Sequence, residues 1–109
     1  MTPLTAPSTF DARRQQPGHF WVFLYSRNSP PSVAAYAFVA SYEREHAREA
    51  VLVAAVEDSP AVTDHVSKAL GIHVETPMIL LVEYGRLGWH ATGDEVTQTA
   101  MELAHLPAL

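Results

Sequence analysis

Three short apolar runs, at residues 20–25, 51–56 and 78–82, constrain the fold of this chain most strongly. The first run is aromatic and β-branched, and the first two are bounded by turn-forming residues, which is typical of strands buried on both faces, while the third run predicts a further strand. The segments between them, about residues 31–47 and 61–70, have helical spacing of apolar residues. Strands buried on both faces pair in parallel when a helix crosses between them. The sequence therefore predicts an α/β sheet.

A hairpin and a last helix complete the order of elements. Gly85 and Arg86 form a two-residue turn, and residues 87–91 return as a fourth strand, antiparallel to the third. A final helix follows Gly93 or Asp94. The order β-α-β-α-β-β-α, with a right-handed crossover between the first two strands, predicts a four-stranded mixed sheet with helices on both faces.

The N-terminal part has no apolar run. Residues 1–18 are polar and are interrupted by prolines, so we expect an N-terminal tail with one helical turn near residues 10–16. Residues 19–109 are then the folded domain. At this length a domain buries roughly two-thirds of its unfolded surface, which provides a core.

Composition excludes several function classes. Twelve acidic residues against seven basic ones, a formal net charge of −5, disfavour a nucleic-acid groove. The apolar runs are too short to span a bilayer, and the start has neither a basic nor an apolar leader region, so we expect a cytoplasmic protein without a membrane partner. The chain contains no cysteine, which excludes disulfides, Cys-ligated zinc and thiol nucleophiles.

The helix after the first strand has a distinct start. Ser29 is predicted to be its N-cap, and Pro30 occupies the first turn, where a missing N–H is harmless. The core stripe predicted for this helix consists of Val33, Ala34, Ala37, Phe38 and Ala40.

Two landmarks resemble the thioredoxin fold. The segment Ser29-Pro30-Pro31-Ser32 stands where that fold has its Cys-x-x-Cys or Cys-x-x-Ser motif, and Thr76-Pro77 stands where it has a cis-proline before the third strand. The resemblance implies a thioredoxin-like α/β domain, with a groove between these two segments.

A closer resemblance is to the monothiol bacilliredoxins, whose segments HS-x-x-CPIS-x-AAY, G-V-x-H-E-S-P and G-x-x-x-WHASHW-x-IT are similar to three stretches here. These read YSRNSPPSVAAY at 25–36, GIHVETP at 71–77 and GRLGWHATGDEVT at 85–97. The resemblance implies thiol–disulfide exchange that removes bacillithiol, the co-substrate, from S-thiolated proteins, without a bound cofactor. It implies cysteine-containing or S-thiolated proteins as partners. The site residues that it implies are Ser29 and Ser32 for catalysis, and Pro30, Thr76, Pro77, Thr92 and Gly93 for substrate binding.

The departures from the family pattern lie at the site. The nucleophilic cysteine of the family is Ser29 here, its histidine is Val74, and its His-Trp pair is Gly93-Asp94. We therefore expect the chain to be redox-inert. Ser29 is explained either by a single engineered substitution or by natural divergence, and the other departures favour divergence. The alternative function is a non-catalytic thioredoxin-like module that binds a partner protein.

Less specific interpretations apply to the remaining polar residues. Ser29 also fits a plain helix cap, and no G-x-S-x-G motif supports a serine hydrolase. Among six histidines, Glu43 and His46 have the spacing of a carboxylate–His ligand pair, but residues 43–49 are better explained as a solvated helix end. We expect no metal site.

Overall fold

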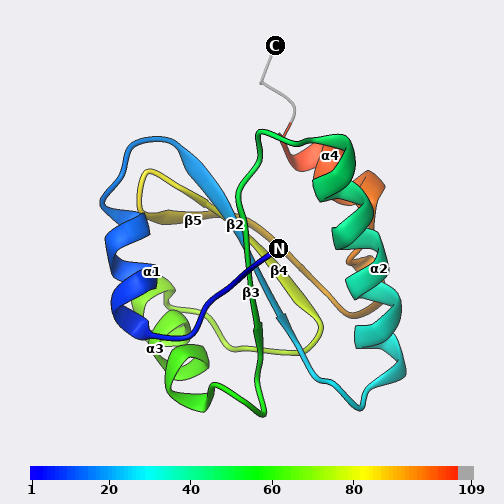
Figure 1. Cartoon of the computed structure of the whole chain (residues 1–109), viewed down its shortest axis with the longest axis horizontal. Coiled ribbons are helices and arrows are strands. Elements are labelled where there is room, and N and C mark those ends of the chain that lie inside the picture. The colour runs from blue at the N-terminus through cyan, green and yellow to red at the C-terminus, as the bar shows by residue number, and fades with distance from the viewer. Residues whose placement is uncertain (106–109) are drawn as a thin grey trace.

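The computed structural model describes residues 1–105 and contains a five-stranded mixed sheet in the order β1-β3-β2-β4-β5 (Figure 1). Its strands are β1 (Thr2–Pro3), β2 (His19–Tyr25), β3 (Val51–Ala55), β4 (Met78–Glu83) and β5 (Arg86–Thr92). Its helices are α1 (Pro7–Arg14), α2 (Pro30–Glu45), α3 (Pro60–Leu70), the 3₁₀ turn η1 (Gly93–Glu95) and α4 (Gln98–His105). No helix among the described residues is long and apolar enough to cross a membrane.

The central strand is β2, which pairs in parallel with β3 and antiparallel with β4. Alternate side chains of β2 enter two separate cores. Phe20, Val22 and Leu24 pack with α1 and α3, whereas Trp21 and Phe23 pack with α2 and α4. Figure 1 shows these two helix pairs on opposite sides of the sheet. The predicted α/β class, with a mixed sheet covered on both faces, is confirmed, and the sheet has one more strand than predicted.

The extra strand corrects the expected tail at residues 1–18. β1 pairs in parallel with β3, and the Leu4 N–H continues the pairing by donating to the Val53 carbonyl at 2.8 Å. Leu4 and Phe10 are 1% and 0% exposed and belong to the core. The domain therefore includes the segment that was assigned to a tail. Pro3 is compatible with structure because it stands in an edge strand, and Pro7 because it begins a helix.

The core face of α2 also differs from the prediction. Its buried residues are Ser32, Ala35, Val39 and Tyr42, whereas Val33 and Phe38 of the predicted stripe are 61% and 45% exposed. Apolar residues occur all around this helix, so their spacing does not identify the buried face. Two side chains with hydroxyl groups, which a hydrophobic pattern discounts, define that face instead.

A polar cluster lies at the end of the sheet where β2 begins. The Glu49 carboxylate, whose side chain is 11% exposed, accepts hydrogen bonds from Trp21 Nε1 at 3.0 Å and from the Tyr42 hydroxyl at 3.1 Å. His19 Nε2 lies 2.7 Å from Oε2 of the same carboxylate. Burial and the adjacent Glu49 raise the pKa of Tyr42 above its usual range. Glu49 is therefore a partly buried anchor that accepts from two buried donors, which corrects its assignment to a solvated helix end.

Candidate functional site

The candidate site lies where β2 ends and α2 begins. Leu24 pairs with Met78, so the strand register places Pro77 level with Tyr25, the last residue of β2. The chain then leaves the sheet through residues 26–29 and enters α2 (Figure 1). These elements bring the two sequence landmarks, the Ser-Pro-Pro-Ser segment and the Thr76-Pro77 segment, to the same edge of the sheet.

The substrate-binding residues predicted from β5 lie at this edge too. Met78 pairs with Thr92, and the Gly93 N–H donates to the Pro77 carbonyl at 2.9 Å. The η1 turn that follows packs against α2. The structure therefore brings together Pro77, Thr92 and Gly93, and the Thr76–Pro77 peptide bond is cis.

Ser29 occupies the N-cap position of α2, with extended backbone angles φ −98° and ψ 119°. Its hydroxyl makes no capping hydrogen bond, so it does not cap the helix by its side chain. Pro30 and Pro31 remove two N–H donors from the first turn, and the Val33 N–H donates to the Ser29 carbonyl at 3.1 Å. Within residues 1–105, the Ser32 N–H is thus the one first-turn amide left to meet an anion at position 29.

The Ser32 side chain has a structural role. It is fully buried, and its hydroxyl oxygen accepts a hydrogen bond from the Ser26 N–H at 3.1 Å. This bond ties the loop between β2 and α2 to the first turn of the helix. Ser29 is half-buried and Pro30 is exposed, so these two residues, unlike Ser32, face the exterior.

Two acidic residues that the sequence did not connect with the site, Glu57 and Asp58, lie just after the end of β3. The Ser26 hydroxyl donates to Glu57 Oε2 at 2.5 Å and the Arg27 N–H donates to Oε1 at 3.2 Å. The bond from Ser26 is the main reason that the pKa of Glu57 lies below its usual range. The Arg27 guanidinium pairs with Asp58 and does not turn toward Ser29. Adjacent parallel strands end side by side, and this is the signal that could have located both carboxylates.

Thr76 has free backbone groups beside this loop. Among residues 1–105, neither its N–H nor its carbonyl makes a hydrogen bond, and the residue is half-buried. An extended peptide could therefore pair with Thr76 as an added strand. The Ser29 hydroxyl likewise has no hydrogen-bond partner within these residues, so no base activates it as a nucleophile.

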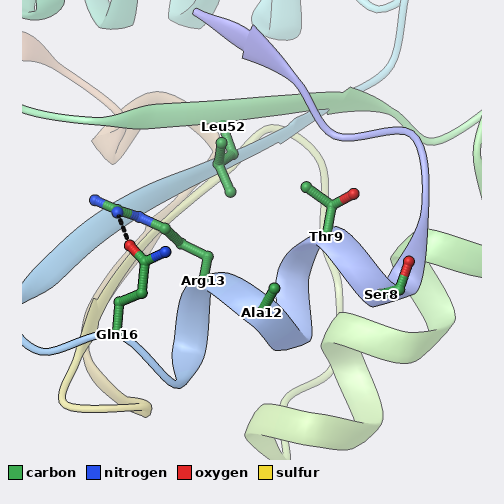
Figure 2. Close-up of a pocket in the computed structure, with 6 residues that line it drawn as sticks. All are labelled: Ser8, Thr9, Ala12, Arg13, Gln16 and Leu52. Carbon is green, nitrogen blue, oxygen red and sulfur yellow. Dashed lines mark hydrogen bonds between the residues drawn. The ribbon is translucent and has the colours of Figure 1, made fainter.

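Two surface cavities lie away from Ser29 and Thr76. One cavity of about 430 Å³ lies between α1 and β3 and is lined by Ser8, Thr9, Ala12, Arg13, Gln16 and Leu52 (Figure 2). Arg13 donates to the Gln16 side chain at 2.5 Å, which leaves that guanidinium already partnered. Val74, which replaces a family histidine, packs against the core beneath α3 and lines a different cavity of about 320 Å³.

The family model described as monothiol bacilliredoxin BrxC matches residues 2–101. The chain belongs to this family. Solved structures similar to it share the fold. One, whose description gives it a thioredoxin fold, has a TM-score of 0.88 at 16% identity, with 96% of this chain and 93% of that one covered.

Two thioredoxins are also similar to this bacilliredoxin family member. Thioredoxin from Fasciola hepatica has a TM-score of 0.77 at 11% identity, with 94% of each chain covered. Mitochondrial thioredoxin 3 from Saccharomyces cerevisiae has a TM-score of 0.74 at 17% identity, with 94% of this chain and 91% of that one covered. The thioredoxin fold and the family resemblance seen in the sequence are thereby confirmed.

Proposed function

We propose that this member of the monothiol bacilliredoxin family is a non-catalytic binding module. It holds an extended segment of a partner protein against Thr76 and the start of α2, without exchanging thiols. The observation that carries the proposal is the combination at one edge of the sheet: a hydroxyl without an activating partner at position 29, and unpaired backbone groups at Thr76, both within residues 1–105.

The chemistry of serine explains why exchange is absent. Thiol–disulfide exchange requires a thiolate that attacks a disulfide sulfur. A serine hydroxyl does not ionise usefully near neutral pH, and oxygen does not form a mixed disulfide. Because the chain contains no cysteine at any other position, no second residue supplies the thiol. The chain is therefore redox-inert.

The binding mode follows from the backbone of Thr76. Main-chain hydrogen bonds to an added strand provide affinity that is largely independent of sequence, and nearby side chains provide selectivity. Pro30 is exposed, and Thr92 and Gly93 are half-buried at the same edge, so they border the ligand. A protein segment that carries a cysteine or an S-bacillithiolated cysteine fits the ancestry of this groove, with the sulfur directed toward Ser29.

A second candidate function applies if the native residue at position 29 is cysteine. Membership in the bacilliredoxin family favours it. A thiolate at position 29 would attack the bacillithiol sulfur in the mixed disulfide of an S-bacillithiolated protein. It would then hold bacillithiol as a new mixed disulfide, and the protein thiolate would leave. Sequencing codon 29 of the source gene distinguishes the two functions.

The test of the binding function uses two-dimensional NMR of the intact chain. The probes are extended peptides with a central cysteine, in the free-thiol and S-bacillithiolated forms. We expect saturable shifts at the amides of residues 26–29, 32, 33, 76, 92 and 93, with affinities in the micromolar to millimolar range.

The matched control is the same peptide with one central amide N-methylated, which removes a donor from the ligand and leaves the protein intact. Weaker binding of the methylated peptide supports strand addition. Shifts confined to other surfaces, or equal binding of both peptides, would contradict the proposed mode. The absence of any shift at millimolar peptide would remove the proposed function.

A further inference from the structure

A cluster of potential metal ligands lies at the end of α2 that is remote from Ser29. Glu45 is the last residue of α2, His46 is its C-cap, and Glu102 comes from α4, which lies beside this end of α2 (Figure 1). One ligand atom from each of these residues lies within 4.8 Å of the other two, and His46 Nε2 is 3.0 Å from Glu102 Oε2. We propose that these three side chains bind a divalent transition-metal ion, with Zn²⁺ as the ion that fits best.

The donor set determines the type of ion. Imidazole nitrogen suits zinc and the later transition metals, and one imidazole with two carboxylates matches zinc sites that have three protein ligands and an open fourth position. At metal–ligand distances of about 2.0 to 2.2 Å, neighbouring ligand atoms in a tetrahedral site lie roughly 3.4 Å apart. The His46–Glu102 separation is close to this value already, and the exposed Glu45 side chain needs only a rotamer adjustment to join them.

The position of the cluster favours a cation. The carboxyl end of a helix carries partial negative charge, which makes a carboxylate there unfavourable unless a cation is near. Glu45 is the last residue of α2, and Glu102 adds a second negative charge beside it. A metal ion with two positive charges neutralises both carboxylates and removes their repulsion from the helix end.

The histidine is held in place before any ion binds. The His46 ring stacks on Tyr42, with centroids 4.4 Å apart and an interplanar angle of 27°. The backbone N–H of His46 donates to the Tyr42 carbonyl at 2.9 Å, and its backbone carbonyl accepts the Glu49 N–H at 2.9 Å. A fixed imidazole reduces the conformational entropy that metal binding must overcome.

Two neighbouring groups compete with the ion. Gln98 Nε2 donates to Glu45, so this amide must move or remain on the carboxylate oxygen that does not bind the ion. Arg48 shares with Glu45 and His46 the lining of a cavity of about 390 Å³. The same open cavity provides room for water molecules to complete the coordination of the ion.

The test is titration of the untagged full chain with Zn²⁺. Binding is measured by isothermal titration calorimetry, and the melting temperature is measured by thermal unfolding with and without the ion. The absence of cysteine removes thiol ligands, so the interpretation concerns histidines and carboxylates alone. We expect saturable uptake of one ion per chain, and a rise in melting temperature because the ion links α2 to α4. His46→Ala and Glu102→Gln should each weaken binding by more than the roughly 10- to 100-fold loss that is typical of groups behind the ligands.

The matched control is His65→Ala. His65 Nε2 lies 2.7 Å from Asp11 Oδ1, so this pair resembles the His46–Glu102 pair but has no third metal-ligating side chain within reach in the described part of the chain. Unchanged Zn²⁺ affinity in His65→Ala supports the site. Glu45→Gln serves as a further variant that preserves the fold, because its side chain is exposed. Absence of saturable uptake, or equal affinity in the His46 and His65 variants, would overturn the proposal and leave an ion pair between helices.

Discussion

The substitution Ser29→Cys tests whether this scaffold still supports a reactive thiol. In the chain as it stands, the N-cap residue is half-buried and one first-turn amide among the described residues, the Ser32 N–H, remains to stabilise an anion at this position. A charge-assisted hydrogen bond from one N–H contributes about 1.5 to 3 kcal/mol, and the helix end contributes a further 0.3 to 1 kcal/mol or so. Each 1.36 kcal/mol or so lowers the thiol pKa by one unit.

These contributions predict a pKa of about 6 to 7 for the introduced thiol, compared with about 8.5 for a free thiol. Two variants test the physical cause. Pro31→Ala in the Ser29→Cys background restores a first-turn N–H and should lower the pKa by about one further unit. Glu57→Gln removes a negative charge near residues 26 and 27, and should therefore also lower the pKa of the introduced thiol.

The assay is titration of thiolate ultraviolet absorbance against pH, followed by incubation with bacillithiol disulfide. The introduced thiolate should attack one sulfur, form the mixed disulfide and release one bacillithiol thiolate. Ser32 cannot resolve this product, because it carries a hydroxyl and is fully buried. A pKa at or above that of free cysteine would refute the argument from the helix end. A low pKa without bacillithiol uptake would indicate that Val74, Gly93 and Asp94 have removed recognition of the co-substrate.

Three further predictions concern stability. Glu49→Ala should lower the free energy of unfolding in urea denaturation by about 1 to 3 kcal/mol for each of the two buried donors, on Trp21 and Tyr42, that lose their acceptor, whereas Glu57→Ala on the exposed surface should change it little. Phe10→Ala should lower it by about 3 to 5 kcal/mol, whereas exposed Ser8→Ala should be nearly neutral; equal, small effects would show that α1 is dispensable. Burial and Glu49 raise the pKa of Tyr42 in the folded chain, so the free energy of unfolding decreases as the pH rises above about 10, where tyrosine ionises in the unfolded chain. Tyr42→Phe should abolish that decrease. An unchanged alkaline profile would contradict its assignment to Tyr42.

The central strands were predictable because burial on both faces leaves a local signal, a short uninterrupted apolar run. The N-terminal elements β1 and α1 leave no such signal. β1 has only two paired residues, and the core contribution of the region consists of isolated side chains such as Leu4 and Phe10. Their burial depends on contacts with β3 and α3, which are distant in sequence.

The sequence predicts where the two segments of the site lie, but it does not predict which charged side chains surround them. The motif resemblance located Ser29 and Thr76, since both are defined by their order along the chain. Residues 26–32 carry one cation, Arg27, and no acidic residue, so the local sequence places no carboxylate near position 29. The structure pairs Arg27 with Asp58 and brings Glu57 onto the loop, because two parallel strands end side by side.

The pairing of β1 with β3 has a consequence for self-association. β3 and the alanine before it form an uncharged apolar segment, and β1 with Leu4 is all that pairs with its outer edge among the described residues. Detachment of these few N-terminal residues would expose unpaired N–H and C=O groups of β3 on an apolar strand, which is a template for a strand from another molecule. The short N-terminal strand thus protects the protein from edge-to-edge aggregation, and proteolytic trimming at this end should favour self-association.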